Sequence, residues 1–345
     1  MASSEEDGAA AAAEQLGSVS LGDTEPPANI GAATKLCSAC GTESDTAEKC
    51  NECECVWYCD KDCKDGHRKE HEHECKRIKT VIDQRGGKLD IGTEVDVGPL
   101  GKLPPQEECP ICMHVLPYDP DLRSYATCCG KTLCLDCDLQ HRQHQTTSGE
   151  RATCAFCREP ILTSDEEVLA RYRKRAELKD PIALYEMAFN YGYGYYGVPV
   201  DHAKFIDLLR ESAGLGYSFA HLQLGIYHNC GDIDVVDVGL EQNEEEALKH
   251  WKKAAEGGDL MAWRALGVME HNKGNRDAAM RHWRLAASRG HRKSMECLIE
   301  NYFEDGLLQH GDLAETLQAF YLARSEMSAW YLAKSRIMNT SLSNT

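Results

Sequence analysis

The residues with the clearest capacity for chemistry are cysteines, and the sequence of 345 residues contains 18 of them. Five pairs have Cys-x-x-Cys spacing, where chance placement would give about one. Thiolates at this spacing bind zinc, whereas redox use of the motif needs a βαβ setting that none of the pairs has. The sequence therefore predicts zinc sites. The five pairs are Cys37/Cys40, Cys50/Cys53, Cys109/Cys112, Cys134/Cys137 and Cys154/Cys157.

The rest of the composition predicts a folded chain in a reducing compartment. Hydrophobic residues make up 42% of the sequence, and no run reaches the roughly 18 apolar residues of a membrane helix. The first residues are acidic and lack the basic region of a secretory signal. We expect an intracellular protein, cytoplasmic or nuclear, with no membrane segment. The net charge of −18 also disfavours a nucleic-acid partner.

The cysteines divide the N-terminal half into modules. Residues 1–34 have an Ala/Gly/Ser/Pro bias and no lysine or arginine, which predicts a disordered acidic tail. We expect one zinc module at 35–78, a linker at 79–106 and a second zinc module at 107–161. Each module is too small to fold on an apolar core alone, so bound zinc should supply much of its folding free energy.

Helical periodicity replaces cysteine spacing after the second module. Ser164 and Glu167 have the spacing of a capping box, which predicts a connecting helix over 164–179. Asp180 followed by Pro181 predicts the start of the next helix, with an N-cap and a proline at the first helical position.

A repeated pattern fills the C-terminal half. Segments anchored on Ala183, Ala220, Ala262 and Ser294 share one offset pattern and lie 32 to 42 residues apart. That period is typical of helix-pair solenoids, in which small residues let neighbouring helices approach closely. We expect repeats over 180–311 and a terminal capping helix over 312–338.

The repeats resemble Sel-one-like repeats, relatives of the tetratricopeptide repeat. The loop Gly194-x-x-Gly197-Val198-x-x-Asp201 matches that family, and Trp251 and Trp283 recur at one position of the second helix. The resemblance implies an all-α solenoid that binds proteins. These two tryptophans and Trp263, which all recur near helix-packing positions, are interpreted as core residues. A tyrosine group in the first loop is interpreted as packing, with ligand contact as the alternative: Tyr191, Tyr193, Tyr195 and Tyr196.

The first cysteine cluster resembles a MYND finger over residues 37–75. Its eight soft ligands suffice for two tetrahedral ions. The resemblance implies that the ligand pairs interleave along the chain. One ion would be bound by Cys37, Cys40, Cys59 and Cys63, and the other by Cys50, Cys53, His71 and Cys75.

Three other polar residues of this cluster have alternative interpretations. Cys55 fits no ligand position and is interpreted as a half-exposed structural thiol. His67 and His73 flank the ligand histidine and are interpreted as helix surface, with a shift of register as the alternative.

The MYND resemblance also implies binding of short proline-containing peptides. MYND fingers bind such peptides in an aromatic and polar groove. Trp57 and Tyr58 occupy the aromatic positions of this groove, and their rings either face a ligand or pack internally. Lys64 and Arg68 stand where the family commonly has glutamine and tryptophan.

The second cluster resembles a RING finger. The common RING pattern has a histidine where this chain has Lys131, so the preferred assignment follows an all-cysteine subclass with Cys128 and Cys129 as adjacent ligands. His141 or His144 in place of one adjacent thiol is the alternative. The preferred ligand sets are Cys109, Cys112, Cys134 and Cys137 for one ion, and Cys128, Cys129, Cys154 and Cys157 for the other.

The RING resemblance implies a ubiquitin ligase that binds a ubiquitin-conjugating enzyme and positions its thioester. Ile111 and Pro160 would contact the conjugating enzyme, and Arg158 would bridge it to ubiquitin. Ala155 replaces the usual proline, and no tryptophan lies between Cys137 and Cys154. Both departures alter the groove for the conjugating enzyme.

The predicted fold is two small cross-brace zinc-binding modules, MYND and RING, followed by an all-α helix-pair solenoid. We expect four zinc ions, two per finger, all structural because every coordination position is filled by protein. The favoured function is a RING-type ubiquitin ligase whose MYND finger and repeats bind a substrate or partner protein. The alternatives are a non-catalytic adaptor and, from the net charge, a binder of basic proteins such as histones.

Overall fold

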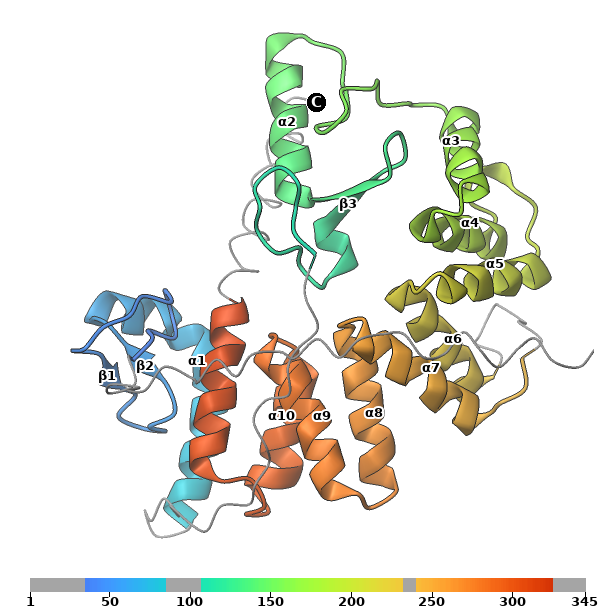
Figure 1. The fold of residues 1–345 in the computed structure, drawn as a ribbon. Helices are drawn as coiled ribbons and strands as arrows, with labels where there is room; N and C mark the ends of the chain where they lie inside the picture. The colour runs from blue at the N-terminus through green and yellow to red at the C-terminus, as the bar shows by residue number, and fades with distance from the viewer. Residues whose placement is uncertain (1–34, 85–106, 232–239, 325–345) are drawn as a thin grey trace, which may run out of the picture. The chain divides into compact units, whose positions relative to one another are not determined.

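The computed structural model describes residues 35–84, 107–231 and 240–324. The predicted tail at 1–34, residues 85–106 of the predicted linker and residues 325–338 of the predicted terminal helix lie outside the described residues. The described residues all belong to one compact unit. Figure 1 shows the order of the elements from the first hairpin to the last helices.

The first module consists of a short hairpin followed by a long helix. Strands β1 (Glu48–Lys49) and β2 (Trp57–Tyr58) pair antiparallel, with Glu48 opposite Tyr58. Helix α1 (Lys61–Gln84) buries Ile78 and Val81 on the face that also carries the ligand positions. The predicted linker therefore begins with six helical residues, 79–84.

The second module has the same plan, a hairpin before a helix. A 3₁₀ turn (Pro120–Leu122) leads into β3 (Arg123–Ala126), which pairs antiparallel with β4 (Lys131–Cys134), and α2 (Leu135–Ser148) follows directly. Cys134 is the N-cap of α2, and its sulfur accepts a hydrogen bond from the amide of Cys137. Gly149 ends the helix in the left-handed conformation, with φ of 66°.

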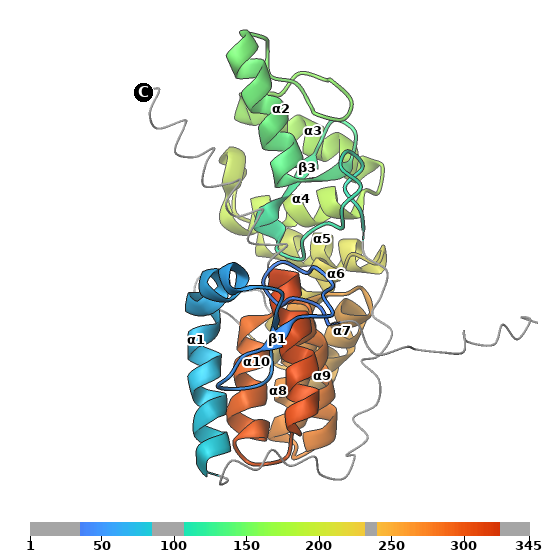
Figure 2. The ribbon, with the colours of Figure 1, turned by 90° about the vertical axis from the view of Figure 1, so that its left-hand side faces the viewer.

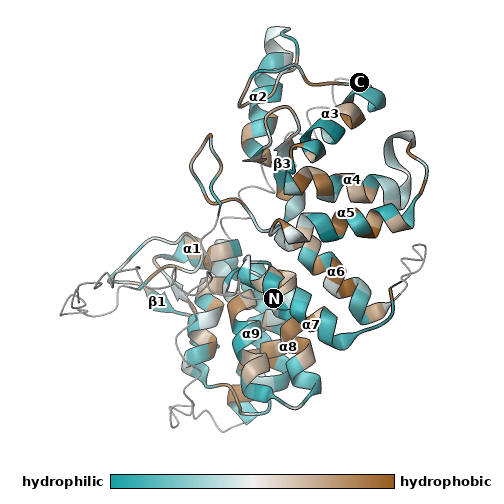
Figure 3. Cartoon of the chain, turned by 45° about the vertical axis from the view of Figure 1, so that its right-hand side comes forward, coloured by the Kyte–Doolittle hydropathy of each residue, from teal (hydrophilic) through white to brown (hydrophobic). Residues whose placement is uncertain are grey.

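The rest of the described chain is an array of helices. The two predicted starts are confirmed: Ser164 accepts from the amide of Glu167, and Asp180 accepts from the amides of Ile182 and Ala183. Figure 3 shows that α4 is more apolar than α7, which follows it in the array after α5 and α6. The elements are α3 (Asp165–Glu177), α4 (Pro181–Tyr193), η2 (Tyr195–Gly197), α5 (His202–Gly214), α6 (Ser218–Cys230), α7 (Glu244–Glu256), α8 (Leu260–Asn272), α9 (Arg276–Ser288), α10 (Arg292–Leu298), the π-helical η3 (Ile299–Phe303) and a helix over 310–324.

Successive helices approach closely where a glycine of one helix packs against a tryptophan ring of the next. A Cβ on Gly225 in α6 would lie 2.4 Å from the ring of Trp251 in α7. A Cβ on Gly267 in α8 would lie 2.3 Å from the ring of Trp283 in α9. Both tryptophans are buried, as predicted, whereas Trp263 in α8 is only half-buried and packs against the cluster that contains Trp251.

The first module shares an apolar core with the end of the helical array. Ile78 and Val81 of α1 belong to the same buried cluster as Met295 of α10 and Leu317 of the helix over 310–324. Arg77 forms an ion pair with Glu300 at 2.6 Å across this contact. Figure 2 shows α1 running beside the last helices. The module therefore closes the array where its last helices would otherwise expose apolar side chains.

The second module contacts the start of the array through its hairpin. The hydroxyl of Tyr125 in β3 donates to Asp180 at 2.8 Å, and the N-cap of α4 thereby joins the two parts. Gly130 lies in the hairpin turn at φ of 70° against the guanidinium of Arg175. Among the helices of the described residues, none is long and apolar enough to cross a membrane.

Candidate metal centres

Four sets of four side chains converge in the structure. Within each set the candidate ligand atoms all lie within 4.8 Å of one another. Tetrahedral zinc with four thiolates at 2.3 Å needs sulfurs about 3.8 Å apart, so the sets have the size that zinc requires. The sets are Cys37/Cys40/Cys59/Cys63, Cys50/Cys53/His71/Cys75, Cys109/Cys112/Cys134/Cys137 and Cys128/Cys129/Cys154/Cys157.

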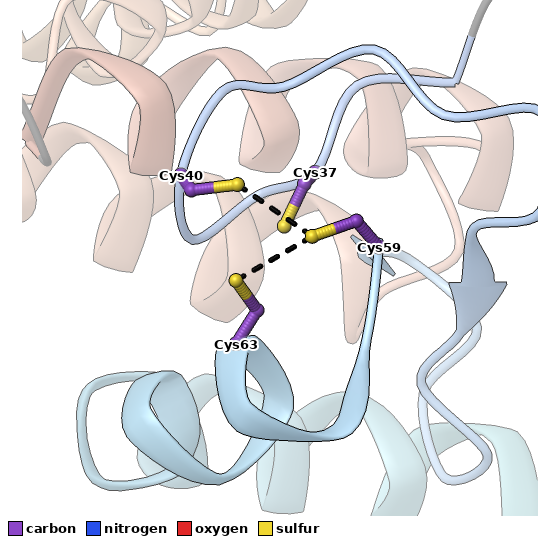
Figure 4. Close-up of side chains that lie close together, drawn as sticks. All are labelled: Cys37, Cys40, Cys59 and Cys63. Atoms are coloured by element: carbon purple, nitrogen blue, oxygen red, sulfur yellow. Dashed lines mark hydrogen bonds between the residues drawn. The ribbon is translucent and has the colours of Figure 1, made fainter.

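The first set joins the loop before β1 to the start of α1. Figure 4 shows the four sulfurs pointing toward one another. The sulfur of Cys59 lies 3.7 Å from that of Cys40 and 3.5 Å from that of Cys63. The side chain and amide of Thr42 hydrogen-bond to Cys40 and lower the pKa of its thiol to about 6. That favours the thiolate, the form that binds metal.

The second set is buried and includes the histidine. The sulfurs of Cys50 and Cys75 are 3.7 Å apart, and the sulfur of Cys53 lies 3.2 Å from Nε2 of His71. Nδ1 of His71 lies 3.2 Å from the hydroxyl of Tyr321, which donates to Glu74 at 3.2 Å. The phenol therefore accepts the Nδ1 proton and leaves Nε2 free for a metal.

The third and fourth sets interleave along the second module. The sulfurs of Cys112 and Cys134 are 3.8 Å apart, and those of Cys128 and Cys157 are 3.4 Å apart. Cys129 completes the fourth set, so both adjacent thiols of the preferred assignment face the same centre.

The two histidines that were alternatives to an adjacent thiol lie outside the fourth set. Nε2 of His141 contacts the hydroxyl of Thr153 at 3.3 Å, and His144 is exposed. Lys131 is exposed too, with its ammonium 5.9 Å from the ring of Phe156.

A shared backbone turn provides independent support for metal at four of the five cysteine pairs. The residue after each pair is left-handed: Gly41 at φ of 73°, Glu54 at 55°, Met113 at 61° and Arg158 at 67°. Each of these amides donates to the carbonyl of the first cysteine of its pair, at 2.8 to 3.0 Å. Non-glycine residues adopt this conformation only where the surroundings impose it. The turns aim both sulfurs of a pair at one point.

Backbone amides also favour charged sulfurs in the second module. Burial by itself raises the pKa of the Cys109 thiol, but amide hydrogen bonds from Cys134 and Cys112 outweigh it and lower the pKa to about 7. The amide of Cys134 lies 3.4 Å from this sulfur. Such donors stabilise a thiolate before any metal binds.

Two side chains beside the second set join the first module to the array. Cys55 is buried, 3.1 Å from Nε2 of His310, so its predicted half-exposure is wrong: the end of the helical array covers the thiol. His67 is buried as well, so its interpretation as helix surface is wrong. Its ring packs edge-on against Tyr321 at 4.3 Å, and its Nδ1 contacts the hydroxyl of Tyr58 at 3.1 Å. His73 is exposed, as predicted.

The two aromatic residues before Cys59 have different surroundings. Tyr58 is buried and bonded inside the module, whereas Trp57 is half-buried with the ammonium groups of Lys35 and Lys49 over its ring at 4.6 and 5.1 Å. A depression of about 320 Å³ beside the second set is lined by Lys64 and Arg68 among others. Its lining is therefore partly basic, unlike the groove implied by the family pattern.

The predicted conjugating-enzyme contacts all lie on the two turns of the second module or beside them. Ile111 is 42% exposed. Arg158 is exposed, with Nη1 within 3.1 Å of both ring nitrogens of His141. Pro160 is half-buried, and its carbonyl accepts from Arg171 at 3.0 Å.

Family models match two parts of the chain. Residues 37–75 match the model of the MYND finger, and three segments match the model of the Sel1 repeat: 181–217, 218–259 and 265–291. Neither model covers the second module at 107–161. The chain thus contains a MYND finger and Sel1 repeats beside a further cysteine-rich module.

Two solved structures resemble parts of the chain. A Sel1 repeat protein from Oxalobacter formigenes is 25% identical, with a TM-score of 0.35; the match covers 38% of this chain and 97% of that one. The protective antigen c5321 of uropathogenic Escherichia coli is 19% identical, with a TM-score of 0.27; the match covers 55% and 44% of the two chains. A search of curated proteins found no match.

These findings define a zinc-binding protein built from protein-interaction modules. The described residues hold four zinc sites, two in each cysteine-rich module. The MYND finger and the Sel1 repeats are of kinds that mediate contacts between proteins.

Proposed function

We propose that the sixteen converging side chains are the zinc ligands and that the second module is a RING finger that binds a ubiquitin-conjugating enzyme. In this proposal the chain is a ubiquitin ligase that forms no covalent intermediate. It accelerates transfer by holding the thioester of the conjugating enzyme in a reactive pose. The MYND finger and the repeats bind the substrate or a partner protein.

Four exposed apolar side chains on the second module carry the proposal. They lie on the two metal-binding turns or next to them: Ile111 is 42% exposed, Met113 66%, Val115 41% and Phe156 44%. The proposed zinc ions would fix the backbone beneath these side chains. Large apolar side chains exposed on a fixed backbone are typical of a protein-docking surface.

Arg158 supports the same surface. Its left-handed backbone follows the last cysteine pair, and His141 contacts its guanidinium. An arginine held in place loses little entropy when its donors meet carbonyl groups of a second protein. It is therefore suited to bridge the conjugating enzyme and ubiquitin.

The test is an autoubiquitination assay of the zinc-loaded full chain with a panel of conjugating enzymes. Chains should form with at least one enzyme, and Ile111→Ala should reduce the rate by about tenfold or more, as loss of a central interface residue does. Leu178→Ala is the matched control, because Leu178 is 66% exposed on the array, outside the module. Absence of chains with every enzyme in the panel would reject ligase activity.

A non-catalytic adaptor is the second candidate, favoured by one specific residue. Ala155 is 7% exposed and fills the position where RING fingers commonly present a proline to the conjugating enzyme. A titration of each conjugating enzyme against the full chain separates the candidates. Weak binding that Ile111→Ala abolishes supports a RING surface, whereas no binding by any enzyme supports the adaptor.

A further inference from the structure

The first repeat carries a depression that combines aromatic rings with carboxylates. It measures about 620 Å³ and opens between the start of α3, the middle of α4 and the turn η2. Its lining includes two acids and no lysine or arginine. The lining residues are Asp165, Tyr185, Glu186, Phe189, Asn190, Tyr195 and Tyr196.

The rings form an aromatic wall in which Tyr193, itself outside the lining of the depression, connects Phe189 to Tyr195. The centroids of Tyr185 and Phe189 are 4.7 Å apart, and Phe189 stacks on Tyr193 at 5.9 Å. Tyr193 in turn stacks on Tyr195 at 5.7 Å. Tyr193 and Tyr195 are 45% and 55% exposed, so their rings remain available after the fold is complete. The interpretation of these two residues as internal packing is therefore incomplete.

Backbone strain lies at the same place. Tyr196 adopts a left-handed conformation, with φ of 54° and ψ of 29°. Strain of this kind persists where the surrounding structure imposes it, and it is concentrated at binding sites. Its effect here is to turn one more ring toward the depression, 6.3 Å from the ring of Tyr172.

The acids of the depression lack a cation among the described residues. Glu186 forms no hydrogen bond or ion pair with any part of the chain that the structure describes, and burial raises the pKa of its carboxyl. Burial also raises the pKa of Tyr196, with the charges of Glu186 and Asp165 adding to the effect. Both acids line the same depression as the rings.

We infer that this depression binds the cationic side chain of a lysine or arginine in an extended segment of a partner protein. Ring faces attract a cation that carboxylates neutralise, and the combination rejects anions and apolar side chains. The chain uses this contact internally on the neighbouring ring, where the ammonium of Lys204 lies 3.9 Å from the centroid of Tyr191. The inference rests on the proposed partner-binding role of the repeats and not on ligase activity.

The test is fluorescence anisotropy of labelled, acetylated glycine-serine peptides with one central residue, titrated with the zinc-loaded full chain. The central residue is lysine, trimethyl-lysine, arginine or glutamine. The cationic peptides should bind about tenfold or more tighter than the glutamine peptide. Retained binding of trimethyl-lysine, which cannot donate hydrogen bonds, would indicate that the ring faces dominate. Preferred binding of lysine or arginine would indicate that hydrogen bonds to the carboxylates dominate.

Variants test whether the cationic peptides bind in this depression. Glu186→Gln and Tyr195→Leu should each weaken the cationic peptides about fivefold or more, while Glu177→Gln should not. Glu177 is the matched control because it is an exposed acid on α3 outside the depression. Equal binding of lysine and glutamine peptides, or affinity unchanged by both depression variants, would overturn the inference. Autoubiquitination of the same variants is scored separately, so loss of one property does not count against the other.

Discussion

The hydroxyl of Tyr321 lies 3.2 Å from Nδ1 of His71. One residue belongs to the last described helix and the other to a zinc site of the MYND finger. The contact continues through Glu74, which accepts from Tyr321 at 3.2 Å and from Arg292 of α10 at 3.2 Å. The helical array therefore supplies the outer hydrogen bonds of a metal site in a module far away in sequence.

Replacing Tyr321 should weaken that metal site. Tyr321→Phe keeps the ring but removes the acceptor that orients His71, so zinc affinity of the second site should fall about 10- to 100-fold. The free energy of unfolding should fall by about 1–2 kcal/mol because Glu74 also loses a donor. Competition with a chelating zinc indicator measures the first effect, and chemical denaturation the second.

Tyr302→Phe is the control for this prediction. Tyr302 is also buried and its hydroxyl also contacts a histidine Nδ1, that of His271 at 3.1 Å, but His271 is not among the converging ligands. Its loss should lower stability similarly without changing zinc affinity. A similar loss of zinc from both variants would refute a specific role for Tyr321.

Adding one methyl group between paired helices should destabilise the array. A Cβ on Gly225 or Gly267 would overlap the ring of Trp251 or Trp283 at under 3 Å. Gly225→Ala and Gly267→Ala should each cost about 1–3 kcal/mol, the usual cost of overpacking.

Gly214 in α5 provides the opposite case, because a Cβ there meets nothing within 4 Å. Gly214→Ala should be neutral or stabilise the helix by up to about 1 kcal/mol. Thermal unfolding of the three variants side by side gives the comparison. Equal effects at all three positions would show that the tryptophan contacts are not tight.

Removing a ligand should change the number of bound ions by one. Native mass spectrometry of the intact chain should count four zinc ions, the number of converging sets. Cys128→Ser should leave three, because zinc binds serine far more weakly than a thiolate. Cys230→Ser is the control, since that thiol is exposed on α6. Four ions retained by Cys128→Ser would mean that another side chain completes the fourth site.

Acid should weaken the contact between α6 and α7. Nδ1 of His221 lies 2.9 Å from Nδ1 of His250, an arrangement that holds one proton between the rings. Burial, with the charges of His221 and His228 adding to it, lowers the pKa of His250 from 6.5 to about 4. Glu246 favours the charged form and Lys253 opposes it, both as smaller effects.

Because folding lowers the pKa of His250, protonation of this residue destabilises the folded chain. Below pH 6.5 the unfolded chain takes up this proton before the folded chain does, so stability falls as the pH drops from 6.5 toward 4. Melting temperatures of wild type and His250→Gln across this range measure it, and a zinc indicator in the same samples reports metal loss. The wild type should lose more stability than the variant. Parallel curves would contradict the prediction.

Local spacing made much of the molecule predictable. The cysteine pairs and the anchors from Ala183 to Ser294 are short-range patterns, and the MYND finger and Sel1 repeats that they indicate match family models. N-caps such as Asp180 could be predicted for the same reason, since a cap depends on residues at most three positions away.

Contacts between distant segments could not be predicted in this way. His67 has the polar neighbours of a surface residue, but the ring of Tyr321 covers it. Ile78 and Val81 fit any amphipathic helix, and only the folded chain shows that they pack against the last helices. The aromatic wall around Tyr195 appears in the sequence as a cluster of tyrosines between glycines. This pattern does not show whether the rings pack internally or are exposed.

The shared core has a consequence for synthesis on the ribosome. Ile78 and Val81 leave the exit tunnel early, while Phe320 of the same buried cluster is among the last described residues to be made. Until Phe320 has been made, the apolar face of α1 is exposed and can associate with other proteins. We therefore expect the nascent chain to bind a chaperone. Translation that stops before Phe320 would leave a metal-loaded finger with one side permanently uncovered.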